Sequence, residues 1–521
     1  MRRLRFILPL AAIALAASCG CGKAASSEGD PSSEVKEPSG EVPSSEPSQE
    51  PSQEPSEQPA AFTRYNKDMV IHSDLLDTDL KYSVYLPAGY EENTAERYPV
   101  VYMLHGYGDD NNSWNGDWLH ASDKIKTLES SGLRDMIYVY PTGFQGYYVN
   151  KYDGSFNYMD MFVREFIPHI DATLRTVADK QHRCITGYSM GGFGAYVLAA
   201  KHPEMFLCSA PLSMSFRTDQ QYKTEGSGWR SQWGSLFGGK DEKGEGRLTD
   251  YYKDHCPYYV FNDSNREGLE TVKWYFTCGD DEEQLLIAGD SLHVVMRDRH
   301  FAHEYRVGNG GHTSTYWMNA LSEVLPMFAY YMDGGEKWPG KDIKDPEVPS
   351  VSLNADGAFL SETFSENGTL VFVAFKDADG QALVSELIRA ASSKDCALLP
   401  CDLGVMSLED WMTRYSSSYK GYKSQAFGLA EAAAEVFAKK ESFDKMYFVA
   451  PGLGEDPITE KGQKYVILNT DDGPNYKDTG ALYASCKRSG ASFDYRVIKG
   501  TGDFAKDALR CIETYKSLFT F

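Results

Sequence analysis

The feature that most constrains the fold is an alternation of apolar runs with amphipathic segments that begins near residue 61. The run YPVVYMLHG is continuously apolar, as strands buried on both faces of a parallel sheet are. The segment MDMFVREFIPHIDATL places its apolar residues at helical spacing. This alternation predicts an α/β fold in which helices cover a mostly parallel central sheet.

The alternation continues to about residue 333 and is interrupted once. Residues 214–272 are irregular and rich in Gly, Asp and aromatics, which predicts an insertion over one end of the sheet. An alternating run, LKYSVYLPAGY, is typical of an edge strand. Residues 334–352 carry Gly, Pro and charge and predict a linker between a domain at 61–333 and a second, smaller α/β domain at 353–521.

The N-terminus predicts export. Three arginines, an apolar run and the small residues LAASC indicate a signal peptide over residues 1–18, with Cys19 as a lipidated first residue. Leucine stands at Leu15 rather than at the usual third position before the cysteine, so ordinary secretion is the alternative. Residues 19–60 repeat Pro, Ser and Glu and predict an extended tether. We therefore expect a bacterial lipoprotein of the outer membrane, on its periplasmic or cell-surface side.

Composition excludes one class of partner. The net charge is −23, and such an acidic surface repels phosphate backbones, so nucleic acid is not expected to bind. Eight cysteines follow Cys21, and several of them lie in apolar strand-like runs, which favours free buried thiols. Cys396 and Cys401 are the pair that the sequence leaves open.

The segment CITGYSMGGFG places a serine in the pattern G-x-S-x-G where a predicted strand gives way to a helix. In such a turn the serine adopts strained backbone angles, and its hydroxyl projects above the edge of the sheet. Ser189 is therefore the candidate nucleophile. The Met190 amide directly after it and the Tyr107 amide, which follows Gly106 in LHGYGDD, are the candidate oxyanion donors.

A serine hydroxyl needs a base and an acid that orients the base. His312 follows the strand-like HEYRV in the glycine loop GNGGH, whereas His105, His202, His293 and His303 lie in or beside regular elements. The acid is expected in the loop GDDEEQ after WYFTCG, which offers Asp281, Glu282 and Glu283. The chain order Ser, acid, His is that of α/β-hydrolases.

Four segments, YPVVYMLHGYGDD, MDMFVREFIPHIDATLRT, GYSMGGFGAYVLAAKHPEMF and HEYRVGNGGHTSTYW, resemble the esterase D family, which includes feruloyl and acetylxylan esterases of carbohydrate esterase family one. The resemblance covers residues 70–332 and implies an α/β-hydrolase fold, Ser189 as nucleophile, His312 as base and the Tyr107 and Met190 amides as oxyanion donors. The family commonly has an aspartate where this chain has Glu282. We expect Glu282 to serve, with Glu283 and Asp281 as alternatives.

The resemblance implies a serine esterase that hydrolyses feruloyl or acetyl esters on plant cell-wall polysaccharide without a metal or organic cofactor. An acyltransferase of the same fold and a surface glycan-binding lipoprotein without catalysis are the alternatives. Trp229 and Trp233, in GWRSQWGSLFGG of the insertion, are candidate substrate-binding residues that stack on a sugar or phenolic ring. The alternative is that they anchor the loop.

The second half repeats the order of predicted elements. GYKSQAFG matches GYSMGGFG, and YRVIKGTGD matches YRVGNGGH. We expect a degenerate, non-catalytic hydrolase-like copy, with Lys423 in the place of the serine and Asp503 near the place of the histidine. An unrelated α/β domain is the alternative.

Overall fold

A computed structural model describes residues 62–340 and 353–521, apart from residues 355–356, 362, 377–378, 392–393, 417 and 455. The predicted signal peptide, Cys19 and the tether lie outside these residues, as does most of the predicted linker. Within the described ranges every helix is too short or too polar to cross a bilayer. Residues 61–521 form one compact unit.

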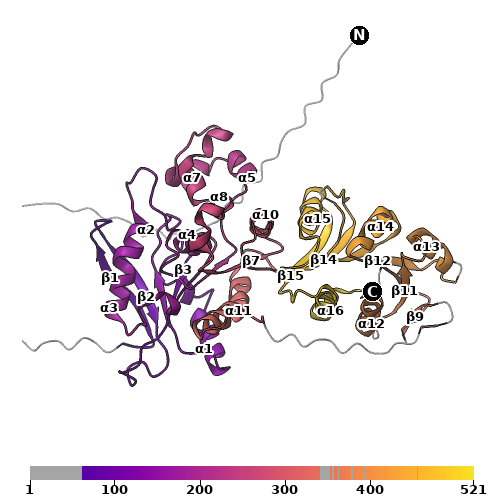
Figure 1. Cartoon of the computed structure of the whole chain (residues 1–521), viewed down its shortest axis with the longest axis horizontal. Helices are drawn as coiled ribbons and strands as arrows, with labels where there is room; N and C mark the ends of the chain where they lie inside the picture. Colours follow the sequence, from indigo (N-terminus) through magenta and orange to yellow (C-terminus); the bar gives the residue numbers. More distant parts are fainter. Residues whose placement is uncertain are drawn as a thin grey trace, which may run out of the picture. The chain divides into compact units, whose positions relative to one another are not determined.

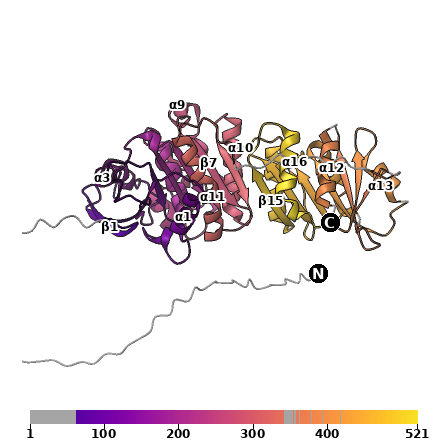
Figure 2. The same cartoon turned by 90° about the horizontal axis from the view of Figure 1, so that it is seen from below.

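The described strands join into a single 15-stranded sheet in the order β1-β2-β4-β3-β5-β6-β7-β8-β15-β14-β13-β12-β10-β11-β9 (Figures 1 and 2). The strands of the first half are β1 (Tyr65–Ser73), β2 (Thr78–Tyr85), β3 (Val100–Leu104), β4 (Ile137–Pro141), β5 (Arg183–Tyr188), β6 (Cys208–Leu212), β7 (Lys273–Gly279) and β8 (Glu304–Gly308). Those of the second half are β9 (Phe359–Leu360), β10 (Thr369–Phe375), β11 (Cys396–Asp402), β12 (Lys423–Leu429), β13 (Lys445–Val449), β14 (Lys464–Thr470) and β15 (Ser492–Ile498).

In the first half β3 to β8 run parallel, while β1 and β2 pair antiparallel with their neighbours. This order and these directions are those of the α/β-hydrolase fold, so the fold expected from the sequence is confirmed. One detail is wrong: the run predicted as an edge strand forms β2, and β1 covers its outer edge, with Ile71 opposite Leu80.

Helices cover both faces of this sheet. Tyr102 and Leu104 of β3 point into the core shared with α4, whereas Val101 and Met103 point into the core shared with α1 and α11. The alternation is the period of two that a strand imposes on its side chains. The helices are α1 (Ala121–Ser130), α2 (Tyr158–Met161), α3 (Ile167–Thr173), α4 (Met190–Lys201), α10 (Glu283–Asp298) and α11 (Ser314–Met332).

Between β6 and β7 the chain forms the predicted insertion, a cluster of short helices that lies at the top of the view in Figure 1. Its helices are α5 (Asp219–Thr224), α6 (Ser235–Phe237), α7 (Asp250–His255), α8 (Pro257–Val260) and α9 (Arg266–Leu269). Aromatic side chains fill its centre, where Tyr222 stacks on Tyr252 with ring centroids 3.9 Å apart.

The second half repeats the strand order of the first half, apart from β1, which has no counterpart among the described strands. Its order β9-β11-β10-β12-β13-β14-β15 corresponds to β2-β4-β3-β5-β6-β7-β8, and β9 is antiparallel to its neighbour as β2 is. Its helices are α12 (Asp379–Ala391), α13 (Leu408–Ser416), α14 (Ala433–Ala438), α15 (Tyr476–Ser489) and α16 (Phe504–Thr514). The halves meet where β8 and β15 pair antiparallel, with Val307 opposite Val497.

The eight cysteines from Cys184 to Cys511 are free and buried. This agrees with the thiol state that the sequence favoured. Cys396 and Cys401 both lie on β11, and neither is in a disulfide.

Candidate active site

Ser189 lies in the sharp turn between β5 and α4. Its backbone angles are φ 58° and ψ −116°, a combination that costs a residue with a Cβ of the order of 1–3 kcal/mol. The flanking glycines permit the turn: a Cβ on Gly191 would lie 2.2 Å from the Leu104 carbonyl oxygen, and one on Gly187 would lie 2.4 Å from that of Gly191. The predicted strand, turn and helix around the serine are therefore present.

Glu282 and His312 form a hydrogen-bonded pair. The His312 Nδ1 donates to Glu282 Oε2 over 2.6 Å. The glutamate side chain is 1% exposed and the imidazole 39%, so the acid is fixed while the base reaches solvent. Glu282 follows β7 and His312 follows β8, and neighbouring parallel strands bring both loops to one rim of the sheet.

The buried carboxylate is held on its other oxygen. Oε1 accepts hydrogen bonds from the Ser213 hydroxyl at 2.5 Å and from the Gly279 amide at 2.9 Å. Ser213 in turn accepts a hydrogen bond from the Trp317 indole at 2.9 Å. Ser213 and Trp317 were not predicted from the sequence, because a lone serine after a strand and a tryptophan in a helix carry no motif.

The same residues connect the acid–base pair to the serine. The Trp317 ring lies 4.9 Å from the His312 ring and stacks on Tyr188, the residue before Ser189, at 4.3 Å. The Ser189 amide donates to the Leu212 carbonyl next to Ser213. Among the described residues no hydrogen bond joins Ser189 to His312. A nucleophile and its base commonly reach bonding distance only when substrate binds.

The two candidate oxyanion donors are the backbone amides of Tyr107 and Met190. Among the described residues, neither the Tyr107 amide nor the Met190 amide donates to another protein group. Met190 is the first residue of α4, so its N–H belongs to the helix N-terminus, where partial positive charge favours an anion. A Cβ on Gly106 would lie 2.6 Å from the Tyr188 ring, which explains the glycine before Tyr107.

The other acids and histidines that the sequence offered do not join this hydrogen-bonded pair. Asp281 and Glu283 flank Glu282 but are exposed. The His105 imidazole is buried, donates to the Gly106 carbonyl and accepts from the Gly143 amide. Burial lowers the pKa of His105, so this ring is a neutral structural group.

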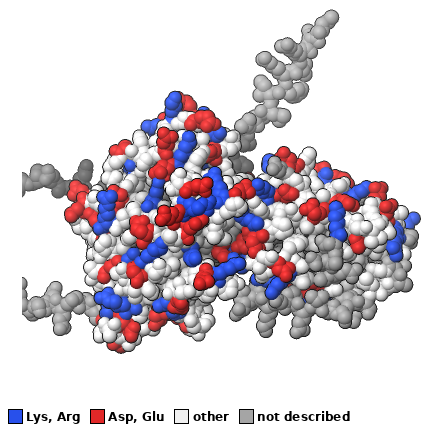
Figure 3. Space-filling view, in the orientation of Figure 1, with Lys and Arg blue, Asp and Glu red and all other residues white. Residues whose placement is uncertain are grey.

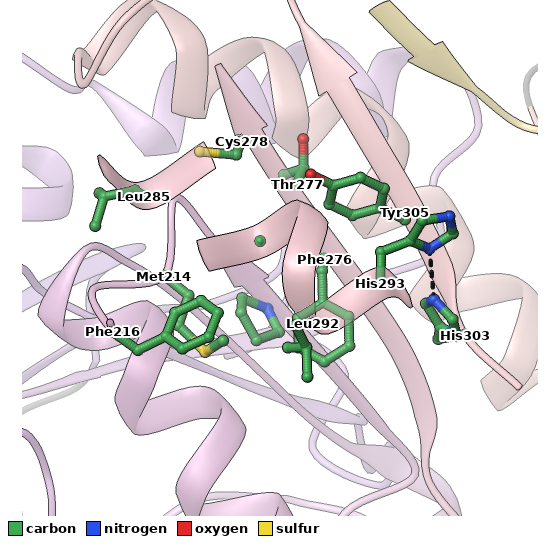
Figure 4. Close-up of a pocket in the computed structure, with 12 residues that line it drawn as sticks. Met214, Phe216, Phe276, Thr277, Cys278, Leu285, Leu292, His293, His303 and Tyr305 are labelled. Atoms are coloured by element: carbon green, nitrogen blue, oxygen red, sulfur yellow. Dashed lines mark hydrogen bonds between the residues drawn. The ribbon is translucent and has the colours of Figure 1, made fainter. Parts of the chain in front are cut away.

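His293 and His303 face each other with their ring nitrogens 2.8 Å apart beside a small apolar cavity (Figure 4). Burial lowers the pKa of both rings, and that of His303 falls to about 4. The cavity, which Met214, Phe276 and Leu292 help to line, has a volume of about 20 Å³. That is room for about one water molecule, so this cavity does not accommodate an acyl group.

Trp229 and Trp233 lie inside the insertion and are 1% and 2% exposed. The Arg247 guanidinium covers Trp229, and Trp233 packs 4.7 Å from the Tyr147 ring. Neither indole presents a free face, which is the placement that loop anchoring requires.

Two aromatic rings near the turn that holds Ser189 are exposed: Trp118 lies 5.9 Å from the ring of Tyr188, the residue before the serine, and Tyr107 follows Gly106, which is packed against the same tyrosine. Tyr107, which is 43% exposed, lies 6.2 Å from the Tyr147 ring, and Trp118, which is 44% exposed, lies 5.7 Å from the Trp317 ring. Sequence reasoning singled out Tyr107 for its amide and did not consider Trp118. In the described part of the chain, no group of three or more His, Cys, Asp or Glu side chains is placed to hold a metal ion.

In the second half the corresponding positions hold no reactive side chain. Ala430 follows β12 as Ser189 follows β5, and it shares the positive φ, at 45°. Gly473 occupies the third position after β14, and Gly502 the fourth after β15, where the first half has Glu282 and His312. The prediction for Lys423 is wrong, because that residue begins β12 rather than following it.

Together the topology and the serine turn define an α/β-hydrolase with a buried acid behind its histidine. Residues 73–328 match the family model named Esterase.

Curated relatives match a shorter stretch. An endo-1,4-beta-xylanase/feruloyl esterase of Xylanibacter ruminicola is 35% identical over 135 residues, which is 24% of this chain and 18% of that protein. The esterase Rv1288 of Mycobacterium tuberculosis is 33% identical over 130 residues, 23% of this chain and 26% of its own length. The chain thus spans about a quarter or less of these relatives. A solved ferulic acid esterase is 27% identical, with 52% of this chain and 100% of that chain covered and a TM-score of 0.44.

Proposed function

We propose that the chain is a serine esterase that hydrolyses acyl esters through an acyl-enzyme. The observation that carries the proposal is the 2.6 Å contact between His312 Nδ1 and the buried Glu282 carboxylate, at the rim of the sheet where Ser189 follows β5. A carboxylate in that position fixes the tautomer that leaves Nε2 free to accept a proton.

In the proposed reaction Ser189 Oγ attacks the ester carbonyl while His312 Nε2 takes the hydroxyl proton. The Tyr107 and Met190 amides bind the oxyanion, and Glu282 stabilises the imidazolium through Nδ1. His312 then gives its proton to the leaving alcohol as the C–O bond breaks. A water molecule, deprotonated by the same imidazole, releases the acid and restores the serine.

We propose feruloyl or acetyl groups on plant cell-wall polysaccharide as the substrate class. The Xylanibacter relative is named an endo-1,4-beta-xylanase/feruloyl esterase, which supports this class. The exposed rings of Tyr107 and Trp118 near the serine turn also support it, because flat amphipathic rings stack on sugars and phenolic acids. The substrate is then held at an open surface.

We also propose that the protein is exported and anchored through Cys19 at the outer membrane, with residues 19–60 as a tether. The support is the N-terminal sequence alone. Metabolic labelling with a fatty acid tests the anchor: the wild type is expected to carry the label and Cys19→Ala to lose it. A wild type without label would contradict the proposal.

Release of p-nitrophenol from p-nitrophenyl acetate and of ferulate from methyl ferulate tests the activity, with Ser189→Ala as the control. The expected result is release that depends on Ser189. Product analysis on acetylated and feruloylated xylan then identifies the acyl group. Release that is equal in wild type and Ser189→Ala, or absent from both, would contradict an esterase and favour a glycan-binding protein.

A further inference from the structure

The interface between the halves contains one arginine–aspartate ion pair that occurs twice, once in each direction. On β8, Arg306 Nη1 donates to Asp471 Oδ2 of the second half over 2.7 Å. On β15, Arg496 Nη1 donates to Asp280 Oδ2 of the first half. Both arginines directly precede the paired valines, so the two ion pairs are related by the same approximate two-fold symmetry as the strands.

The correspondence extends to the loops behind the two aspartates. Asp280 Oδ1 accepts a hydrogen bond from the Gly310 amide at 3.0 Å. Asp471 Oδ1 accepts one from the Gly500 amide at 2.8 Å. Each aspartate therefore ties the loop after its own strand to the loop after the neighbouring strand, while the other half's arginine holds its second oxygen.

The two copies of this contact differ in what they support. Asp280 stands two residues before Glu282, and Gly310 stands two residues before His312. The corresponding places behind Asp471 and Gly500 are Gly473 and Gly502, which have no functional side chain. Only the contact that the second half makes to the first reaches groups that act in the proposed reaction.

We propose that Arg496 of the second half is a positioning residue for the acid–base pair of the first half. The inference rests on the proposed function, because it assigns Arg496 a role in that reaction. The guanidinium holds both loops at once: Nη1 contacts Asp280 after β7, and Nη2 donates to Asn309 after β8 over 2.8 Å. The second half is then a working part of the esterase, although it has no triad of its own.

Burial makes this contact consequential. The side chains of Arg496 and Asp280 are 2% and 3% exposed. Burial raises the pKa of Asp280, and the Arg496 charge opposes that rise. Without the guanidinium, Asp280 must take up a proton or turn toward water, and either change weakens its hold on the Gly310 amide. The Glu282 and His312 loops then lose their common support.

The test compares kcat and KM of the full-length protein for p-nitrophenyl acetate. Arg496→Met is expected to lower kcat by about 10- to 100-fold with little change in KM, because misplacement of a catalytic group slows the chemical step. Arg496→Lys should recover part of the loss. Lys499→Met is the matched control: Lys499 follows the same strand and makes an interdomain ion pair, but to Glu304, away from the triad loops.

The symmetry supplies a second comparison with gentler variants. Asp280→Asn and Asp471→Asn each replace a buried carboxylate that faces an arginine of the other half. In both variants the NH₂ group of the asparagine can face the N–H groups of the guanidinium, which it cannot accept from. Asp280→Asn is expected to lower kcat by about 10-fold or more. Asp471→Asn is expected to keep the wild-type kcat. Thermal unfolding of each variant shows whether loss of either ion pair lowers the stability of the protein equally.

The outcomes are distinct. A wild type without Ser189-dependent release contradicts the proposed function itself. An active wild type in which Arg496→Met matches Lys499→Met, or Asp280→Asn matches Asp471→Asn, overturns the role of Arg496. If Arg496→Met does not fold, the kcat of Arg496→Lys is compared with that of Lys499→Met, and the kcat of Asp280→Asn with that of Asp471→Asn; equal values would again overturn the role of Arg496.

Discussion

At the scale of single residues, burial and the hydrogen bond to His312 distinguish Glu282 from its two acidic neighbours. Replacement of Glu282 by Gln removes the charge that stabilises the imidazolium and should lower kcat roughly 10³- to 10⁴-fold, because the amide favours the wrong tautomer of the base. Asp281→Asn and Glu283→Gln change exposed side chains and should stay near wild type. Steady-state kinetics on methyl ferulate measures all three. A larger loss for either neighbour would move the acid to that position.

The strained backbone of Ser189 gives a stability prediction at the same position. Glycine adopts φ 58° without the penalty that a Cβ brings, so Ser189→Gly should be about 1–3 kcal/mol more stable than Ser189→Ala. Urea unfolding of the two inactive variants measures the difference. Equal midpoints would mean that the turn is not strained.

Much of the site could be predicted from the sequence, because its reactive groups lie in glycine-rich turns that have motifs. Ser189, His312 and the three candidate acids were found in this way. The supporting residues were not: Ser213 and Trp317 approach Glu282 only because β6 and α11 are neighbours of β7 in space. One sequence also does not fix loop length, so it could not separate Glu282 from Glu283; the hydrogen bond from His312 to Glu282 separates them.

At the scale of elements, the packing of α4 against β3 depends on glycine. A Cβ on Gly191 would meet the Leu104 carbonyl oxygen at 2.2 Å, and backbone there cannot retreat without moving the central strand. Gly191→Ala should destabilise the protein by more than about 3 kcal/mol or prevent folding. Gly228, in the insertion, has open space at its Cβ position, so Gly228→Ala is the control. Thermal unfolding with no difference between the two would contradict the packing argument.

The insertion provides a prediction that separates anchoring from substrate contact. Trp233→Ala removes a buried side chain from the centre of the insertion and should cost about 3–5 kcal/mol of stability. Trp118→Ala removes an exposed ring and should leave stability near wild type while raising KM for methyl ferulate. Unfolding curves and KM values for both variants test this. A raised KM with unchanged stability for Trp233→Ala would restore the stacking role.

The elements themselves could be predicted well where apolar runs were long, as for β3 and α11. Two errors have physical causes. β2 alternates as an edge strand does, but β1 covers it, and the polar sequence YNKDMVIHS of β1 gave little strand signal. The sequence match of GYKSQAFG to GYSMGGFG does not correspond to a structural match, because the turn of the second half comes later in the chain, at Ala430.

At the scale of the whole molecule, the two halves share one sheet through a symmetric interface that the sequence did not reveal. The matching YRV segments of β8 and β15 were visible, but strand pairing across distant edges has no local signal. The surface carries acidic and basic side chains interspersed on the face shown in Figure 3, so the negative charge is not gathered there into one patch.

Asp290 on α10 lies in the interface between the halves and makes stability depend on pH. Burial raises its pKa from 3.8 to about 7, although the Tyr305 and Tyr495 hydroxyls donate to it. Between these values the folded state keeps a proton that the unfolded state has released, so stability should fall as pH rises from about 4 to 7, by roughly 1.4 kcal/mol per pH unit.

Asp290→Asn removes this proton linkage. Urea unfolding at pH 5 and pH 7 is expected to show a smaller loss of stability in the variant than in the wild type. Equal losses in both proteins would place the pKa of Asp290 near its usual value and contradict the burial argument.

The central claim is that Ser189 is a nucleophile activated by His312. Mass spectrometry of the intact protein after reaction with a fluorophosphonate ester measures this directly, since such a reagent phosphonylates an activated serine. We expect one adduct per chain, located on the peptide that contains Ser189, and a much slower reaction in His312→Ala. Absence of an adduct in the wild type, or an adduct at another residue, would contradict it.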